Sequence, residues 1–170
     1  MRKNILFLFF ILNSLLIHAS RVDTIEVYSK SMNKSIKNIV IVPKKNIDNN
    51  KSLPVVYLLH GHSDKSDSWL KLVPEIKDYA DRYNVIIVCP DGGYDSWYLD
   101  SPLNKKIRYE TFITKELIKV VDSKYNTIKN RFGRAITGLS MGGHGAFYLS
   151  FKHQDICCLL YTSPSPRDVS

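Results

Sequence analysis

The stretch "RAITGLSMGGHGAF", residues 134–147, decides the fold because it sets one serine between glycines where the sequence pattern changes. An apolar run typical of a strand precedes the motif Gly-Leu-Ser-Met-Gly at 138–142, and a helix-compatible run follows it. A serine on such a tight strand-to-helix turn has a strained backbone, and glycine two residues to either side avoids a clash. The turn would push the Oγ of Ser140 out of the sheet, where a histidine and a carbonyl group can approach it.

Ser140 is therefore the predicted catalytic nucleophile, and the main-chain amide of Met141 is a predicted oxyanion donor. This amide is the first of the new helix, so it points toward the same space as the serine hydroxyl. The alternative is a chance glycine-rich turn, because a five-residue pattern alone is a weak signal.

A second motif, "LLHGHSDKSDSW" at residues 58–69, follows a predicted buried strand. The carboxyl end of a parallel strand is where such a sheet binds its ligand. We expect Gly61 to let the chain turn close to a substrate and the main-chain amide of His62 to be the second oxyanion donor. Neither His60 nor His62 is the expected base, because the base normally follows the nucleophile in this strand order.

The histidines after the serine are also assigned structural or surface roles. His144 lies four residues after Ser140 on the predicted helix, and His153 lies at the end of that helix. The base role is the weaker alternative for each.

The loop at residues 91–101 combines glycines, carboxylates and aromatic side chains. Aromatic rings beside carboxylates suit sugar rings or a phenolic acyl group, so we predict that Tyr94, Trp97 and Tyr98 contact the substrate. The alternative is a loop whose rings anchor it to the core. Asp95 and Asp100 do not indicate a two-acid glycosidase, because a serine at a turn fits that chemistry poorly.

The remaining pattern predicts an α/β fold. Strands alternate with helices, which implies a mostly parallel sheet with helices on both faces. The expected strands are 22–29 and 36–43, an antiparallel pair at the sheet edge, and then 53–60, 85–89 and 134–139. The expected helices are 72–83, 109–124 and one that ends near residue 152.

The N-terminus has the pattern of a secretory signal peptide over residues 1–19. Arg2 and Lys3 precede an apolar run that is short for a membrane span, and a small residue, Ala19, follows. We therefore expect a secreted or periplasmic protein without stable membrane association; a retained N-terminal anchor is the alternative. The basic residues are scattered, and the formal charge of +8 falls to +6 without the leader, so nucleic-acid binding is unsupported.

The last residues change composition abruptly. The segment "CLLYTSPSPRD" resembles the translation of a sequencing adapter, so residues 158–170 are predicted to be a non-native tail after a partial domain at 20–157. A disordered polar tail is the alternative. Cys89 is expected in a buried strand and Cys157 has no evident partner, so no disulfide framework is predicted.

Three segments together resemble the esterase branch of the α/β-hydrolases, which includes feruloyl and acetyl xylan esterases, S-formylglutathione hydrolases and mycolyltransferase antigens. They are "LLHGHSDKSDSW", "CPDGGYDSWYLDSP…YETFITKEL" and "GLSMGGHGA", and the resemblance covers about residues 22–156. It implies that Ser140 is the nucleophile and that the amides of Met141 and of the residue after Gly61 form the oxyanion hole. In this family the catalytic acid and histidine follow this helix, and nothing in the chain corresponds to them.

The resemblance implies a serine esterase that needs no metal or organic cofactor and acts on small-molecule or polysaccharide esters. We expect the chain as given to be a C-terminally truncated fragment without efficient activity, because a serine without its base is a poor nucleophile. An acyltransferase, a non-catalytic carbohydrate-binding protein and a peptidase on the same scaffold are the alternatives. The particular ester and the oligomeric state do not follow from the sequence.

Overall fold

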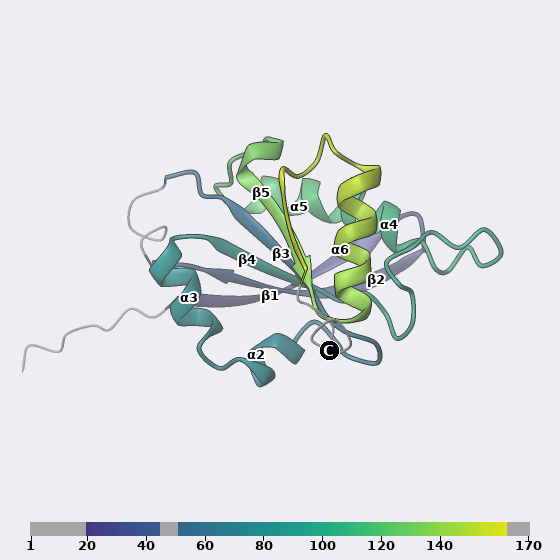
Figure 1. Ribbon diagram of the computed structural model, residues 1–170, viewed down its shortest axis with the longest axis horizontal. Coiled ribbons are helices and arrows are strands. Elements are labelled where there is room, and N and C mark those ends of the chain that lie inside the picture. Colours follow the sequence, from purple (N-terminus) through teal and green to yellow (C-terminus); the bar gives the residue numbers. More distant parts are fainter. Residues whose placement is uncertain (1–19, 45–50, 163–170) are drawn as a thin grey trace, which may run out of the picture.

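The computed structural model describes residues 20–44 and 51–162, which form one sheet flanked by helices (Figure 1). The sheet has six strands in the order β1-β2-β4-β3-β5-β6. Strands β1 and β2 pair antiparallel, β2 pairs antiparallel with β4, and the remaining pairs are parallel. The strands are β1 (Arg21–Ser29), β2 (Lys34–Val42), β3 (Val55–Leu59), β4 (Ile86–Pro90), β5 (Arg134–Gly138) and β6 (Leu159–Thr162). The predicted antiparallel pair at the sheet edge and the predicted central strands are confirmed.

The helices lie in the connections between the strands. They are α2 (Ser68–Leu72), α3 (Ile76–Tyr83), α4 (Tyr109–Thr111), the π-helix η1 (Phe112–Leu117), α5 (Ile118–Lys124), the 3₁₀-helix η2 (Arg131–Gly133) and α6 (Met141–Lys152). Within residues 20–44 and 51–162, none of the helices is long and apolar enough to cross a membrane. The predicted signal peptide at 1–19 lies outside the described residues.

The predicted helix at 72–83 is only partly correct, because the structure divides this region into α2 and α3. Val73, the residue after α2, has φ −131° and ψ 80°, and Pro74 follows it. Proline disfavours helical geometry in the residue before it and has no amide to donate to the preceding turn. The apolar spacing therefore indicates a helix correctly, but it is shorter than predicted and begins at Ile76.

The predicted helix at 109–124 is confirmed as the continuous run of α4, η1 and α5. Its middle is a π-helix, with hydrogen bonds to the fifth preceding residue. On this segment, Glu116 accepts hydrogen bonds from the Ser29 hydroxyl at 2.6 Å and from the Ser31 amide at 2.9 Å. These bonds attach the turn between β1 and β2 to the helix.

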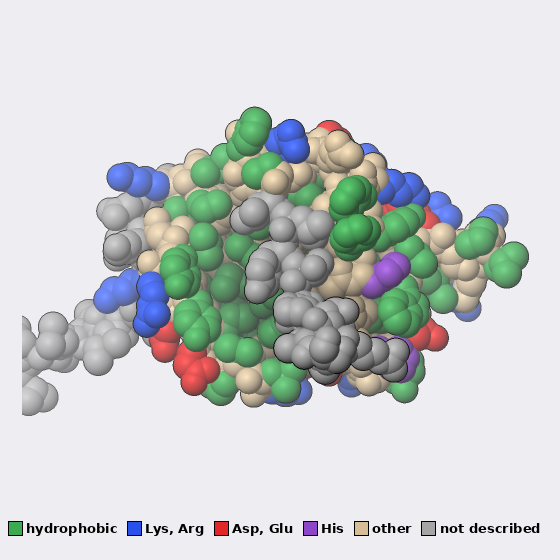
Figure 2. Space-filling model, in the orientation of Figure 1, with side chains coloured by type: hydrophobic (Ala, Val, Ile, Leu, Met, Phe, Trp, Pro, Cys, Tyr) green, Lys and Arg blue, Asp and Glu red, His purple; other side chains and the backbone are tan. Residues whose placement is uncertain are grey.

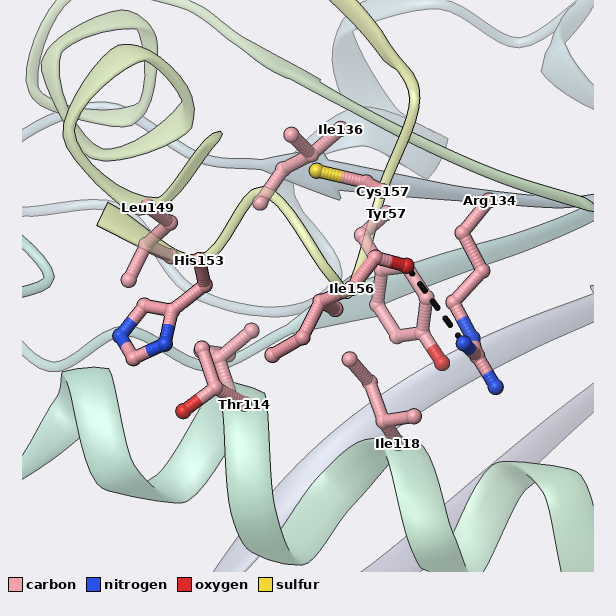
Figure 3. Close-up of a pocket in the computed structure, with 10 residues that line it drawn as sticks. Tyr57, Thr114, Ile118, Arg134, Ile136, Leu149, His153, Ile156 and Cys157 are labelled. Atoms are coloured by element: carbon pink, nitrogen blue, oxygen red, sulfur yellow. Dashed lines mark hydrogen bonds between the residues drawn. The ribbon is translucent and has the colours of Figure 1, made fainter. Parts of the chain in front are cut away.

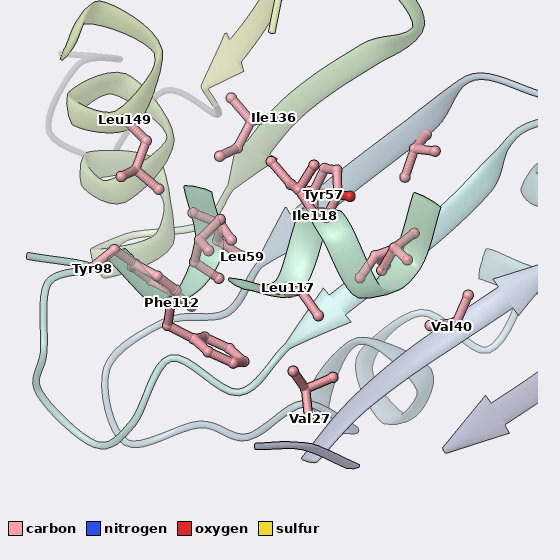
Figure 4. Packing of buried hydrophobic residues seen from close by; sticks show 14 of the residues in the cluster. Val27, Val40, Tyr57, Leu59, Tyr98, Phe112, Leu117, Ile118, Ile136 and Leu149 are labelled. Carbon is pink, nitrogen blue, oxygen red and sulfur yellow. The ribbon is translucent and has the colours of Figure 1, made fainter. Parts of the chain in front are cut away.

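Apolar side chains cover both faces of the sheet, as the predicted fold requires. The larger cluster packs η1, α5 and α6 against one face and includes Leu59, Phe112, Leu117 and Leu149 (Figure 4). The smaller cluster packs Ile76 and Ala80 of α3 against the other face. Its strand residues include Cys89, which is 1% exposed, so the predicted buried strand cysteine is confirmed.

Strand β6 lies in the segment predicted to be a non-native tail. It pairs parallel with β5, and the amide of Cys158 donates to the carbonyl of Arg134 at 3.2 Å. The non-native origin of residues 158–170 stays a prediction. Hydrophobic side chains gather over α6 on the face shown in Figure 2. On α6 itself, Phe147 and Phe151 are exposed, and their ring centroids lie 4.4 Å apart.

Candidate active site

Ser140 lies at the turn between β5, which ends at Gly138, and α6, which begins at Met141. Its side chain is exposed, and its backbone has φ +53° and ψ −117°. A residue other than glycine in such a sparsely populated region costs about 1–3 kcal/mol, and such residues cluster at active sites. The strand, tight turn and helix predicted around the serine are therefore present.

The two glycines that flank the serine lie at a contact between main chains. A Cβ at Gly138 would lie 2.5 Å from the carbonyl carbon of Gly142 and 2.8 Å from the carbonyl oxygen of Leu59. A Cβ at Gly142 would lie 2.7 Å from the carbonyl oxygen of His60 and closer still to that of Leu59. The ends of β3 and β5 and the first turn of α6 thus pack with no room for a side chain.

The loop after β3 approaches the serine at Gly61. A methyl group at Gly61 would lie 3.9 Å from the Cβ of Ser140 and 3.7 Å from the carbonyl oxygen of Leu139. The next residue is His62. Neither its amide nor that of Met141 donates a hydrogen bond to a residue that the structure describes. Both amides are thus unpaired among the described residues; Met141 directly follows Ser140, and His62 directly follows Gly61.

His60 connects this loop to the aromatic loop at 91–101. Its ring is 1% exposed, and its Nε2 accepts a hydrogen bond from the Gly92 amide at 2.8 Å. Because Nε2 accepts, the ring proton lies on Nδ1, which donates to the Gly61 carbonyl oxygen at 2.7 Å. Both ring nitrogens are therefore bonded to main chain, and neither faces the serine hydroxyl as a free base.

The other described histidines contact the aromatic loop and Glu110. The exposed His62 ring packs edge-on against Tyr94, with ring centroids 4.8 Å apart. His144 lies with its Nδ1 3.2 Å from the carbonyl oxygen of Trp97. His153, at the end of α6, lies with Nε2 2.8 Å from Oε1 of Glu110. These contacts match surface and structural roles.

The aromatic loop lies beside the serine turn and presents two of its predicted rings to solvent. Tyr94 is 65% exposed, and its carbonyl accepts from the Ser63 amide at 2.8 Å. Trp97 is 45% exposed and packs edge-on against His144, with ring centroids 5.4 Å apart. Both rings are thus accessible to a ligand at this end of the sheet.

The prediction that Tyr98 contacts the substrate is wrong. Its side chain is 0% exposed, and its hydroxyl donates to the carbonyl oxygen of His60 at 3.1 Å. Asp100 also has a structural role, because it accepts hydrogen bonds from the amide and hydroxyl of Thr111 and pairs with Arg108 at 3.1 Å. The alternative of a loop whose rings anchor it to the core is thus correct for Tyr98.

Sequence reasoning missed a buried carboxylate, Glu110, which lies in α4 and contacts the end of α6. It accepts hydrogen bonds from Tyr148 at 2.8 Å, Lys152 at 3.0 Å and His153 at 2.8 Å. Burial raises the pKa of the Glu110 carboxyl, but these hydrogen bonds outweigh it and leave the pKa below its ordinary value. The sequence carried a signal, because Glu110 falls in the apolar helical stripe that continues through Ile113 and Leu117.

The cavity drawn in Figure 3 is not a substrate site. It lies between the sheet and the helices on one face, and Tyr57, Ile118, Arg134, Leu149 and Cys157 are among its lining residues (Figure 3). Its volume is about 10 Å³. This is about the space of one water molecule, which is too small for an ester group.

The chain belongs to the family described as "Putative esterase", which matches residues 29–161. It is 32% identical over 137 residues to an acetyl esterase of Caldicellulosiruptor saccharolyticus, covering 76% of this chain and 50% of the relative. It is 33% identical over 143 residues to the diacylglycerol acyltransferase/mycolyltransferase Ag85B of Mycobacterium leprae, covering 79% and 41%. A solved ferulic acid esterase matches with a TM-score of 0.74 and 35% identity, covering 83% of this chain and 56% of that one.

These similarities establish the α/β-hydrolase fold and the esterase family. The chain spans about half the length of the acetyl esterase and of the solved ferulic acid esterase.

Proposed function

We propose that the whole protein is a serine esterase that hydrolyses carboxylic esters through an acyl intermediate on Ser140. One observation carries the proposal: an exposed serine with φ +53° is followed directly by Met141, and a Cβ at Gly61, the residue before His62, would lie 3.9 Å from the Cβ of this serine. The amides of Met141 and His62 have no hydrogen-bond partner among the described residues. An exposed hydroxyl beside two main-chain donors is the arrangement that acyl transfer requires. Membership of the esterase family supports the same reaction class.

In the proposed first step, the Oγ of Ser140 attacks the ester carbonyl carbon while a histidine base takes the hydroxyl proton. The carbonyl oxygen becomes negatively charged, and the amides of Met141 and His62 donate hydrogen bonds to it. The carbon–oxygen bond to the alcohol then breaks, and the histidine gives its proton to the departing alcohol. Water, deprotonated by the same histidine, cleaves the acyl-enzyme and restores the serine.

The base and its partner acid are assigned by family resemblance to sequence that follows α6. The contacts of the described histidines support this assignment. His60 uses both ring nitrogens in main-chain bonds, and His153 pairs with Glu110 at the far end of α6 from Ser140.

The proposed substrate is a polysaccharide that carries ester-linked acyl or feruloyl side chains, so that a sugar or phenolic ring lies near the ester. Tyr94 and Trp97 support it, because both rings are exposed next to the serine turn and can stack on a sugar or phenolic ring. Secretion after removal of residues 1–19 would bring the enzyme to such a polymer.

An acyltransferase that uses the same acyl-serine is the second candidate function. It is favoured by the 33% identity to a protein named as a diacylglycerol acyltransferase/mycolyltransferase. Incubation of the whole protein with an ester and a sugar acceptor distinguishes the two. A hydrolase releases free acid, whereas an acyltransferase forms a new ester on the sugar.

The direct test replaces Ser140 with alanine in the whole protein and measures hydrolysis of p-nitrophenyl acetate. We expect kcat to fall by about 10⁴-fold or more, with the circular dichroism spectrum unchanged. Ser150→Ala is the matched control on the same helix, since the hydroxyl of Ser150 has one hydrogen-bond partner among the described residues, the Cys157 sulfur at 3.5 Å. Undiminished hydrolysis by Ser140→Ala would overturn the proposal.

A further inference from the structure

We propose that Tyr98 is a positioning residue that holds the His62 amide in the position where it can act together with Ser140. This inference rests on the proposed function, because it concerns the oxyanion site of the same reaction. Tyr98 contacts three parts of the site at once: the loop after β3, the aromatic loop and α6.

The ring of Tyr98 fills a slot that exists only because two of its neighbours are glycines. A Cβ at Gly92 would lie 2.6 Å from the Tyr98 hydroxyl oxygen, and a Cβ at Gly145 would lie 2.7 Å from the Cγ of the ring. Both distances are far shorter than van der Waals contact. The ring therefore packs directly on the main chain of the aromatic loop and of α6, which fixes the distance between them.

The hydroxyl of Tyr98 extends this contact to the loop that carries His62. It donates to the carbonyl oxygen of His60 at 3.1 Å, and the peptide group that it holds includes the nitrogen of Gly61. Burial raises the pKa of the Tyr98 hydroxyl well above its ordinary value, so the hydroxyl keeps the proton that it donates. The peptide held by Tyr98 thus lies one residue before His62.

The backbone around Tyr98 is shaped to place this ring inward and its neighbour outward. Trp97 has φ +53° and Tyr98 has φ +59°, two consecutive left-handed residues that are not glycine. The Ser96 hydroxyl holds this turn, since it accepts from the Tyr98 amide at 3.0 Å and donates to the Gly92 carbonyl. As a result Tyr98 is 0% exposed, whereas Trp97 is 45% exposed.

A displaced His62 amide should weaken transition-state stabilisation more than substrate binding. The oxyanion forms only as the reaction proceeds, so an amide that is slightly out of place lowers kcat and leaves KM nearly constant. A purely structural role for Tyr98 would lower the amount or stability of folded enzyme without this selective change.

The test compares Tyr98→Phe with Tyr57→Phe in the whole protein, with kcat and KM measured for a soluble aryl ester. Tyr57 is the matched control: it is 2% exposed, and its hydroxyl has no hydrogen-bond partner among the described residues. Tyr98→Phe should lower kcat about tenfold with KM changed less than about twofold. Tyr57→Phe should leave both constants unchanged. Gly145→Ala, which displaces the ring without altering the tyrosine, should reproduce the loss of kcat.

The controls separate this inference from the proposed function. If Ser140→Ala keeps full activity, the proposed function fails. If Ser140→Ala is inactive but Tyr98→Phe has the kcat of the unmodified enzyme, only the positioning role fails. Equal losses in Tyr98→Phe and Tyr57→Phe, or a change confined to KM, would also overturn it.

Discussion

Replacing Gly142 with alanine should destabilise the protein, whereas the same change at the adjacent Gly143 should not. Both glycines lie in the first turn of α6. A Cβ at Gly142 would lie 2.7 Å from the His60 carbonyl oxygen and closer to that of Leu59. A Cβ at Gly143 would lie 3.3 Å from the Gly138 carbonyl oxygen, with no other atom closer than 3.9 Å.

The expected magnitude follows from two opposing contributions. Alanine in place of glycine inside a helix stabilises by about 1 kcal/mol, and this gain applies equally at both positions. The overlap at Gly142 is with main-chain oxygens at the end of β3, which cannot rotate away. Forcing an atom into such a packed site costs about 3 kcal/mol, so we expect a net loss of about 2 kcal/mol. For Gly143→Ala we expect a change within about 1 kcal/mol of zero, because a small shift relieves its single close contact.

Urea denaturation of the whole protein, followed by tryptophan fluorescence, measures both changes. The difference between the two variants isolates the steric overlap, since the helix-propensity gain cancels. If Gly142→Ala and Gly143→Ala have equal free energies of unfolding, the close approach of β3, β5 and α6 at the serine turn is refuted.

Three further predictions concern the serine turn, the buried carboxylate and the exposed tryptophan. Ser140→Gly should be about 1 kcal/mol more stable to urea than Ser140→Ala, because glycine tolerates φ +53° and alanine does not; equal stabilities would argue against strain there. Glu110→Gln should lower the free energy of unfolding by about 2 kcal/mol at pH 7. The pKa of Glu110 in the folded protein lies below its ordinary value of 4.5, so the loss of stability should be constant above pH 4.5 and should disappear as the pH falls through the pKa of the folded protein. A loss of stability that does not change between pH 7 and pH 3 would contradict this prediction. Trp97→Ala should raise KM for a feruloyl ester about tenfold, whereas Leu103→Ala, at an exposed site in the following loop, should not; equal KM values would remove Trp97 from the substrate site.

Most of the fold could be predicted because the strands and helices have distinct hydrophobic periods. The run at 53–60 is almost continuously apolar, as a strand buried on both faces requires, and the helix at 109–124 repeats its apolar residues at helical spacing. The break between α2 and α3 could also be predicted from the sequence, because Pro74 lies inside the predicted helix.

The orientation of side chains in the aromatic loop could not be predicted. Trp97 and Tyr98 are adjacent and chemically similar, yet one ring is exposed and the other is buried. The difference arises from consecutive positive φ angles and from the slot between Gly92 and Gly145. Gly145 is distant from Tyr98 in sequence, so no local pattern identifies the slot.

The central claim is that Ser140 is an activated nucleophile, and covalent labelling tests it most directly. The whole protein is incubated with a fluorophosphonate probe and digested, and the modified peptide is identified by mass spectrometry. We predict one adduct, on the peptide that contains Ser140, and none after Ser140→Ala. An unlabelled Ser140 in an enzyme that still hydrolyses esters would contradict the claim.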